Sequence, residues 1–329
     1  FVHLHNHSDF SLLDGAASID GMVAKAGALG MRHLALTDHG NMFGALKFYN
    51  ACRKNGINPI VGCEFYVAPG SRHVKSGTEA GNKYHHLVLL ARNAQGYRNL
   101  MKLCSVSYVE GFYYKPRIDD EVLLQYREGL LGSSACLAGE IPSLILQHQT
   151  DEAARRAGFY SELLGPGNFY LEIQDHGIPE QKRANRGILE LSKKLGLPVI
   201  ATNDMHYINR EDANAQDILL CIGTGRKKNE SGRMRFEGSE FYMKTPDEMA
   251  RIFAEVPDAL TRTLEAAGKC DLRIDLPGPL LPDYEIPREF SSPEEFLRHI
   301  AGQGLEARYP AVTDDLRRRL AYELDVITS

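Results

Sequence analysis

The first residues of the chain carry a high density of side chains that can bind metal ions. His3, His5 and His7 stand at alternate positions in FVHLHNHSDFSLLDG, and Asp14 follows them. Alternation along an extended strand would place the three imidazoles on one side of a sheet. A buried surface with so much imidazole needs a function, and metal ligation is a common one for histidine.

Further residues of this kind lie at or just beyond the ends of predicted strands. Five of seven predicted strands deliver such residues: His5, His7, Asp38, His39, Glu64, Cys136, Asp204 and His206. His86 is the exception, because it begins its apolar run instead of ending it. In a parallel α/β barrel the active site lies at the C-terminal ends of the strands, so we expect these side chains to converge there.

The strands themselves are predicted from apolar, β-branched runs that alternate with helical patterns. The runs are 1–5, 33–37, 59–65, 86–91, 129–135, 168–175 and 198–204. One of the helical stretches between them begins after Ser18, a good N-cap, and ends at Gly30. Seven strands that alternate with helices predict an α/β protein with a parallel sheet, and a chain of this length favours a closed barrel.

The rim residues have ordinary interpretations when each is taken alone. A single HxH pair is weak evidence, TDHG is compatible with a turn, and a lone cysteine is most often a small buried residue. Their joint placement favours a metal centre. One zinc ion takes about four protein ligands, so the set fits two or three ions that share ligands. Imidazole, carboxylate and thiolate together favour Zn, Mn or Fe over Mg or Ca.

Composition sets the wider limits. The chain has 329 residues, of which 43% are hydrophobic and 25% charged, and its net charge of −5 argues against a generally basic nucleic-acid binder. A local basic channel is still compatible with that net charge. We expect no membrane span and no secretory signal, since neither an apolar run of about 18 residues nor a basic leader is present. Six cysteines without a CxxC pair predict a reduced, cytoplasmic protein.

The texture of the sequence changes after Gly225. GRKKNESGRMRFEG is polar and basic and is predicted to be a loop, and TPDEMARIFAEV starts a helix with Thr245 as its N-cap. LPGPLLPDYEIPREF reads as an extended connector with four prolines, Pro277, Pro279, Pro282 and Pro287. The helical segment that follows looks like the beginning of another domain. We therefore expect one domain at 1–275 and a connector with a truncated second domain at 276–329.

Several motifs together identify a family. They are HLHNHS, LTDHGNMFGALKFY, PIVGCEFYV, HHLVLLARNAQGYRNLMKL, GFYYKPRI, SSACLAGEIP, FYLEIQDHGIPEQ and LPVIATNDMHY. Over about residues 1–275 the chain resembles the N-terminal PHP (polymerase and histidinol phosphatase) domain of the bacterial DNA polymerase III alpha subunits. LRHIAGQGLEARYP and RRRLAYELDVI resemble that family's entry into the palm and thumb region of the polymerase module, which makes this chain an expected fragment of a longer polymerase.

The resemblance implies a distorted (β/α)7 TIM-like barrel with up to three metal ions. Carried over residue by residue, the implied ligands are His5, His7, Asp14, His39, Glu64, His86, Cys136, Asp204 and His206. The family thus selects His86 over its neighbour His85. His3 stands where many PHP proteins have aspartate, and the resemblance leaves it as a residue that supports the ligands. Zinc is the first choice of metal, with manganese or iron as alternatives.

The resemblance also implies phosphoester hydrolysis, in the form of 3′–5′ exonuclease proofreading. We expect a hydroxide generated by the metal ions to attack, with no protein nucleophile. Lys115 and Arg117 are candidate substrate contacts, and the aromatic residues beside them either stack on unpaired bases or pack one loop onto the barrel. The implied partners are the primer 3′ end of DNA, the rest of the polymerase chain, and replisome subunits such as a proofreading exonuclease subunit and a sliding clamp.

Three other functions stay open at this point. The first is a structural, metal-stabilised domain that supports the polymerase or a separate proofreading subunit without hydrolysis. The second is a free-standing phosphatase of the histidinol-phosphate type, which the polymerase-like tail and GFYYKPRI disfavour. The third is an error-prone relative of the replicative enzyme.

Overall fold

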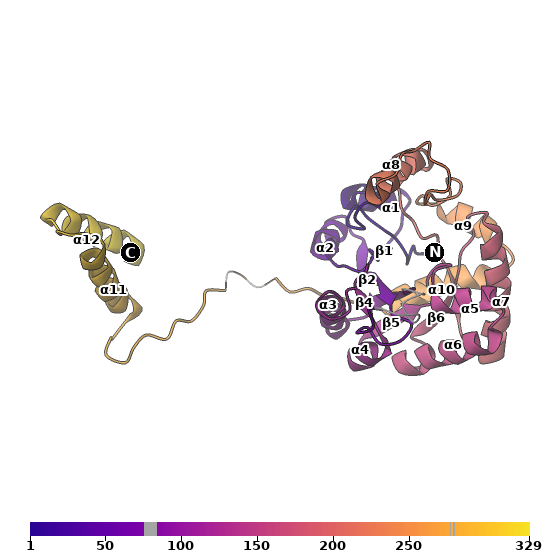
Figure 1. Cartoon of the computed structure of the whole chain (residues 1–329), viewed down its shortest axis with the longest axis horizontal. Helices are drawn as coiled ribbons and strands as arrows, with labels where there is room; N and C mark the ends of the chain where they lie inside the picture. Colours follow the sequence, from indigo (N-terminus) through magenta and orange to yellow (C-terminus); the bar gives the residue numbers. More distant parts are fainter. Residues whose placement is uncertain (76–83, 277, 279) are drawn as a thin grey trace. The chain divides into compact units, whose positions relative to one another are not determined.

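Seven strands form one curled sheet, and helices surround it (Figure 1). The computed structural model describes residues 1–75, 84–276, 278 and 280–329. The strands are β1 (His33–Leu36), β2 (Asn58–Val67), β3 (His85–Ala91), β4 (Arg117–Ile118), β5 (Leu130–Ser133), β6 (Phe169–Ile173) and β7 (Val199–Ala201). They follow the order β1-β2-β3-β5-β6-β7, with β4 paired to β2. This arrangement confirms the predicted α/β class and distorted barrel.

Strand β3 corrects the prediction of an all-parallel sheet. It runs antiparallel to both of its neighbours, β2 and β5, whereas the other pairs are parallel. Val67, the last residue of β2, lies opposite His85, the first residue of β3. Antiparallel neighbours do not require the helical crossover that parallel strands need, and the end of β2 meets the start of β3 at the same rim. As a consequence, His86 lies at the rim where the parallel strands end, although it begins its own strand.

The predicted strand at 1–5 does not form, but this segment closes the sheet. Backbone bonds from Ala35 to His3 (N···O 3.1 Å) and from Thr37 to Asn6 (2.9 Å) join it to the β1 side. On the other side it exchanges backbone bonds with Met205, which follows β7. An irregular segment with only some of the ladder bonds thus fills the seam between β1 and β7, and the strict alternation of its side chains is lost.

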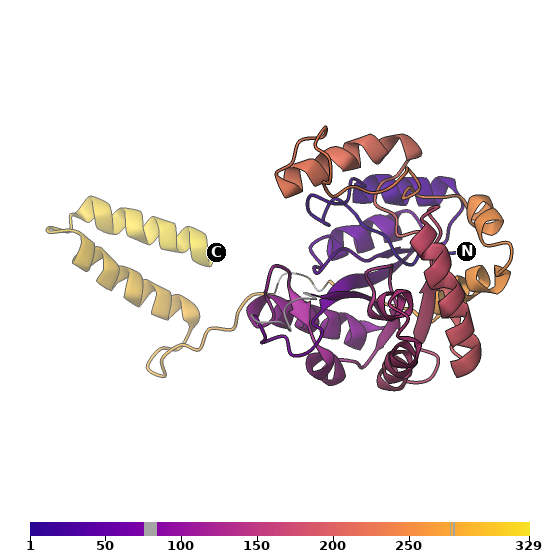
Figure 2. The same cartoon turned by 45° about the vertical axis from the view of Figure 1, so that its right-hand side comes forward.

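The helices of the first unit cover the outside of the sheet, as two views show (Figures 1 and 2). They are α1 (Ile19–Ala28), α2 (Ala45–Lys54), α3 (Ala94–Val109), α4 (Asp120–Gln125), α5 (Glu140–Leu146), α6 (Thr150–Leu164), α7 (Pro179–Leu195), α8 (Ala213–Thr224), α9 (Pro246–Ile252) and α10 (Pro257–Gly268), with the short 3₁₀ helix Arg210–Asp212 before α8. The caps predicted from sequence are present, since Ser18 caps α1 and Thr245 forms a capping box with Glu248 at α9.

The inward face of the sheet changes from apolar to polar along its strands. One apolar cluster contains side chains of six strands, of the N-terminal segment and of α10: Val2, Leu4, Ala35, Ile60, Val88, Leu90, Leu131, Ala135, Tyr170, Ile200, Ala266, Ala267 and Cys270. Two positions further along the strands, on the same face, the buried residues Ser133, Glu172 and Thr202 follow. The barrel is therefore packed with hydrocarbon at one end and lined with polar groups at the other.

The chain divides into the units Phe1–Ile274 and Asp275–Ser329, one residue before the predicted boundary. In the second unit, α11 (Pro293–Arg308) and α12 (Asp314–Thr328) pack on each other. The described residues of the predicted connector form neither helix nor strand before Pro293, while Pro277 and Pro279 lie outside the described residues. All six cysteines are free thiols. Across the described residues, no helix combines the length and the apolar character that crossing a bilayer requires.

Candidate metal centre

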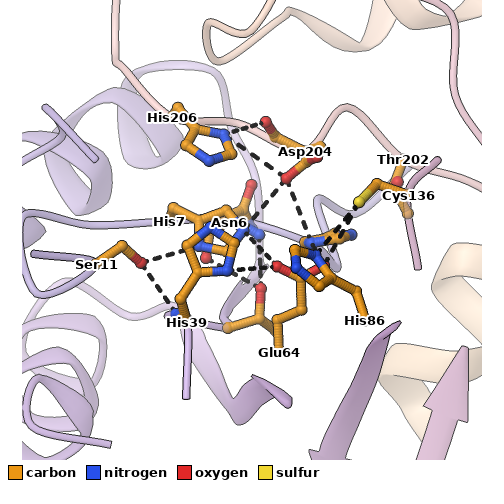
Figure 3. Close-up of polar contacts among 12 residues, drawn as sticks. Asn6, His7, Ser11, His39, Glu64, His86, Cys136, Thr202, Asp204 and His206 are labelled. Carbon is orange, nitrogen blue, oxygen red and sulfur yellow. Dashed lines mark hydrogen bonds and ion pairs between the residues drawn. The ribbon is translucent and has the colours of Figure 1, made fainter. Parts of the chain in front are cut away.

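The structure brings all nine side chains that were expected as ligands to one rim of the barrel. Figure 3 shows His7, His39, Glu64, His86, Cys136, Asp204 and His206 of this group. Glu64 lies at the centre of this group. One of its carboxylate oxygens is 3.3 Å from His5 Nε2 and 2.9 Å from His86 Nδ1. The other is 3.4 Å from His7 Nε2 and 2.7 Å from His39 Nδ1. A single buried carboxylate thus faces four imidazoles, which suits a ligand shared between ions.

Asp204 and Cys136 extend the group on either side. Asp204 Oδ1 lies 3.3 Å from His5 Nε2 and 3.2 Å from His7 Nε2. Cys136 Sγ lies 3.5 Å from His86 Nδ1. The segment after β7 and the loop after β5 therefore contribute an anionic and a soft donor, respectively, next to an imidazole.

Asp14 and His206 complete the group at its more open side. Asp14 Oδ2 lies 3.0 Å from His39 Nε2 and 3.7 Å from His206 Nε2. Gln216, from α8, donates a hydrogen bond to the Asp14 backbone carbonyl at 3.3 Å. The loop that carries Asp14 is thereby tied to a helix that is more than 200 residues away in the sequence.

Glu172 fixes the orientation of His5. Its Oε1 is 2.8 Å from His5 Nδ1 and accepts a second bond from Gln174 Nε2 at 2.9 Å. The hydroxyls of Ser133 and Thr202 donate to the same carboxylate. Because the ionised carboxylate can only accept, Nδ1 carries the proton and the Nε2 lone pair faces Glu64. A carboxylate behind a ligating histidine is the usual arrangement in metal sites.

His7 and His206 are held in the same tautomer by different partners. The Ser11 hydroxyl donates to Asp38 Oδ1 at 2.8 Å, so it accepts from His7 Nδ1 at 2.9 Å. His206 Nδ1 donates to the backbone carbonyl of Asp204 at 2.8 Å. In both rings the Nε2 lone pair is thus directed away from these partners and toward the cluster. Asp38, which lies on the rim as expected, therefore positions the loop and is not part of the cluster.

Several buried atoms of this group make no hydrogen bond of normal geometry within the described part of the chain, although some of them face each other closely, as His39 Nδ1 and Glu64 Oε2 do. They are His5 Nε2, His7 Nε2, His39 Nδ1, Glu64 Oε2, Asp204 Oδ1 and His206 Nε2. Buried polar atoms are almost always satisfied, so a convergent set of orphan lone pairs demands an explanation. Divalent cations would satisfy all of them. The donor types in three overlapping groups fit this: His5, His7 and Glu64; His39, Glu64 and His86; His7, His39 and His206.

The pKa shifts within the cluster indicate that it favours positive charge. Burial disfavours the charged form of His39, but Glu64 and Asp14 outweigh burial and raise the pKa of this imidazole to about 10. Burial likewise opposes ionisation of Glu64 and Asp204, yet the facing imidazoles hold the pKa of both carboxyls well below its usual range. Without metal, protons on imidazoles compensate these carboxylates, and a bound metal ion would release them.

Backbone strain also concentrates at this rim. Leu13, Ala135 and Asp204 have φ values of 60°, 58° and 45°, in the left-handed region that side chains with a Cβ rarely adopt. Leu13 and Ala135 directly precede Asp14 and Cys136. Three of the five non-glycine residues with positive φ in the described ranges are thus at or beside members of the cluster, and the other two are Tyr114 and His148. Such strain persists where the surroundings enforce it, and it is typical of functional sites.

The structure separates the two expected substrate contacts. Arg117 is 2% exposed, and its guanidinium donates to the backbone carbonyls of Gly111 (3.1 Å), Arg72 (3.1 Å) and Val74 (2.9 Å). A guanidinium used in this way holds loops together, and the contact of Arg117 with substrate stays a prediction. Lys115 is exposed, with Nζ 5.4 Å from the centroid of the Tyr66 ring.

His3 takes no part in the cluster. Its ring is fully buried and bonds through Nε2 to the backbone carbonyl of Lys244 at 2.9 Å. Sequence reasoning also passed over Glu172, which fixes His5. The signal was available, because Glu172 is the one charged residue within the apolar strand FYLEI. Such a buried acid requires a partner, whereas nothing in the sequence shows that its partner is His5.

A cavity of about 230 Å³ opens onto the cluster. Its polar end is formed by Asp14, His39, His86, Cys136, Asp204 and His206, and its walls include Leu137, Ile178, Met234, Phe236 and Phe241. His5, His7 and Glu64 do not line it, and their side chains are fully buried. The cluster thus has a closed layer in the barrel and an open layer that an incoming molecule can reach.

Comparison with known proteins gives consistent matches. A family model described as PHP domain matches residues 3–176. The chain is 50% identical over 327 residues to DNA polymerase III subunit alpha of Treponema pallidum, which covers 99% of this chain and 28% of that protein. It is 43% identical over 321 residues to the same subunit of Thermus aquaticus, covering 94% of this chain and 26% of that protein. The chain spans less than a third of the length of these relatives.

Similar solved structures are more distant. A two-domain protein from Bacteroides vulgatus, described as containing a predicted PHP-like metal-dependent phosphoesterase, has a TM-score of 0.39 and 15% identity, over 78% of this chain and 62% of that one. An amidohydrolase from Chromobacterium violaceum has a TM-score of 0.38 and 17% identity, over 63% of this chain and 87% of that one.

Proposed function

Since this chain belongs to the PHP domain family, we propose that its nine clustered side chains bind two or three divalent metal ions and that the centre hydrolyses phosphodiester bonds. The observation that carries the proposal is the convergence of buried lone pairs without partners around Glu64. The proposed ligands are His5, His7, Asp14, His39, Glu64, His86, Cys136, Asp204 and His206.

Charge balance supports more than one ion. Asp14, Glu64, Asp204 and a deprotonated Cys136 carry four negative charges, which two divalent cations would neutralise. The five imidazoles are neutral when they act as ligands and so leave this balance unchanged. The mixture of imidazole, carboxylate and thiolate suits zinc, with manganese or iron as alternatives.

Bound ions of this kind supply Lewis acidity toward a phosphoryl oxygen and a reactive hydroxide near neutral pH. The residues of the chain provide the remaining requirements. Glu172 and Ser11 hold the rings of His5 and His7 in fixed tautomers, so the ligand set is preorganised. The apolar walls of the cavity, including Phe236 and Phe241, exclude water from the reacting phosphate.

For the longer protein to which the relatives point, we propose 3′–5′ exonuclease action on the primer end within a DNA polymerase III alpha subunit. Similarity to those subunits over nearly the whole chain supports the assignment, and the open layer of the cluster gives a phosphodiester access to the proposed ions. DNA, the rest of the polymerase chain and other replisome subunits are the corresponding partners. Lys115 remains the proposed contact to the strand.

The second candidate is a centre that only stabilises the fold. The complete burial of His5, His7 and Glu64 favours it, because these residues cannot reach a substrate. Only the first function includes hydrolysis of a phosphodiester, so one experiment distinguishes the two.

The test measures metal content and primer degradation on the same protein samples. In Asp204→Ala and His5→Ala we expect loss of at least one ion per chain and a fall in hydrolysis of at least about a hundredfold, which corresponds to a few kcal/mol of transition-state stabilisation. Asp151→Ala is the matched control, because the Asp151 side chain is 98% exposed. A metal-loaded wild-type protein that leaves primers intact would favour the structural candidate. Full metal content in Asp204→Ala would refute the ligand assignment.

A further inference from the structure

We propose that the loop between α8 and Phe241 forms a second subsite, which binds the phosphate next to the reacting one and so favours single-stranded oligonucleotides over small phosphoesters. This inference rests on the proposed function. It starts from a second cavity, of about 240 Å³, which is lined by Tyr207, Asn214, Gln216, Asp217, Arg233 and Arg235, among others.

Phe236 lines both this cavity and the one above the metal centre. Its ring lies 4.7 Å from the His206 ring, almost perpendicular to it, and 4.5 Å from the Phe241 ring. Met234, two residues earlier, lines the metal-side cavity and is 58% exposed. The wall between the cavities is therefore an aromatic ring with a flexible thioether beside it, which is a surface on which a nucleobase can stack.

The charges of the second cavity favour an anion. Asp217 is neutralised by Arg233, which contacts both of its carboxylate oxygens at 2.6 and 2.8 Å. Arg233 is also bound to the backbone carbonyl of Lys228, so it braces the loop. Arg235 has no ion pair with any residue in the described ranges, and it is exposed at the cavity. One uncompensated guanidinium is left there, and guanidinium matches the geometry of phosphate.

A hydrogen bond connects the second cavity to the cavity above the proposed metal centre. Gln216 lines the second cavity and donates to the backbone carbonyl of Asp14, which lines the first. A phosphate held by Arg235 would thus sit across Phe236 from the proposed ions. A strand with its terminal base against Phe236 and its next phosphate at Arg235 fits this order, whereas a small phosphomonoester occupies only the metal side.

Binding and hydrolysis are measured separately to test the subsite. The variants are Arg235→Ala and Phe236→Ala, and the matched control is Lys227→Ala, an exposed cation of the same loop that lines neither cavity. Binding uses a fluorescent single strand with phosphorothioate links that resist cleavage, with metal-loaded protein. Hydrolysis uses an oligonucleotide and thymidine 5′-(4-nitrophenyl phosphate), which has no second phosphate.

We expect Arg235→Ala to weaken strand binding about tenfold and to slow cleavage of the oligonucleotide, with no change for the nitrophenyl ester. Phe236→Ala should slow hydrolysis of both substrates, and Lys227→Ala should slow hydrolysis of neither. Strand binding by Arg235→Ala as tight as by wild type would overturn the subsite, and so would an equal loss in Lys227→Ala, which would indicate diffuse charge attraction. Strand binding by the wild type without cleavage of either substrate would refute the proposed hydrolysis and leave the subsite standing, provided that Arg235→Ala still weakens that binding.

Discussion

Glu172 links the barrel interior to the metal centre at the scale of single residues. It receives bonds from His5, Gln174, Ser133 and Thr202 and is 1% exposed. Burial disfavours its ionised form, but His5 and the hydroxyl donors outweigh burial and lower the pKa of this carboxyl. The negative charge therefore stays in place and would make His5 a stronger donor to the proposed metal ion.

We expect Glu172→Gln to weaken metal affinity about 10- to 100-fold while the protein remains folded, because the amide keeps the shape but loses the charge behind His5. Competition with a chromogenic chelator measures the affinity. Glu190→Gln, at an exposed position of α7, is the control. Unchanged affinity in Glu172→Gln would show that His5 is positioned by other means.

His176 gives the protein a predicted acid sensitivity that is separate from the metal ligands. Its ring is buried, stacks on Phe241 and bonds to the Asn203 carbonyl and to Gln181. Burial lowers the pKa of His176 to about 4. Between pH 6.5 and 4 the unfolded chain binds a proton at this residue and the folded one does not, so stability falls as the pH decreases.

The loss amounts to about 3 kcal/mol at most, at about 1.4 kcal/mol per pKa unit. In metal-free protein, His176→Gln should therefore lose less stability than wild type between pH 7.5 and 4, as urea unfolding measures. His73→Gln, at an exposed histidine, should follow the wild type. Parallel curves for His176→Gln and wild type would exclude His176 as a source of acid sensitivity.

How far the sequence predicts the site differs from residue to residue. All nine expected ligands lie in one cluster, because residue type and position at strand ends are local properties. The surroundings of Arg117 were not predictable, because its sequence context resembles a substrate loop while its carbonyl partners come from Arg72, Val74 and Gly111. The atoms that a guanidinium contacts depend on how distant segments of the chain fold around it. Local sequence patterns do not predict those tertiary contacts.

At the scale of elements, a tight turn in the loop after β5 fixes the backbone position of Cys136. A Cβ at Gly139 would lie 2.1 Å from the Ser134 carbonyl oxygen and 3.0 Å from that of Cys136. Gly139 also donates its N–H to the Cys136 carbonyl at 2.8 Å. Only glycine at position 139 therefore allows this tight turn.

Gly139→Ala should lower the free energy of unfolding by about 1–3 kcal/mol and loosen the ion nearest Cys136, because backbone atoms must move to admit the methyl group. Thermal melts and metal analysis measure the two effects. Gly158→Ala is the control: no atom lies within 4 Å of its added Cβ, and alanine in helix α6 should stabilise by about 0.5–1 kcal/mol. Wild-type stability in Gly139→Ala would contradict the geometry.

Six of the seven predicted runs form strands, because each is a short apolar run, whereas the two-residue strand β4 was not predicted. Strand direction was not predictable in the same way. β3 pairs Leu87 with Phe65 in antiparallel register, and an antiparallel neighbour has the same local pattern as a parallel one. The awkward position of His86 at the start of its run was the only sequence signal of the reversal.

At the scale of the molecule, the proposed ions cross-link segments that are far apart in sequence, from His5 to His206. Removal of metal should therefore lower the melting temperature by at least several degrees, because a ligand present at about 1,000 times its Kd adds about 4 kcal/mol to native stability. Scanning calorimetry of metal-loaded and chelated protein measures the shift. Asp204→Ala should respond much less to the chelator, and identical curves for verified metal-loaded and metal-free wild type would contradict the role of the ions.

The two helices of the second unit, α11 and α12, share only a small core. In its two helices only Leu324 is buried, while Tyr322, Val326 and Ile327 are between 59% and 67% exposed. An isolated helix pair with so small a core has little stability of its own. This unit therefore fits the proposal that α11 and α12 belong to a larger module.

The seam at the N-terminal segment has a consequence for synthesis. His5 and His7 leave the ribosome well before their backbone partner Met205, which emerges about 200 residues later. At about 5–20 residues per second, this interval lasts roughly 10–40 seconds. During that time the nascent chain lacks two of the nine proposed ligands, Asp204 and His206, and the N-terminal segment has an uncovered edge where Met205 later pairs with it. Ions acquired early would meet incomplete coordination, so correct loading belongs to the moment when the last strand docks.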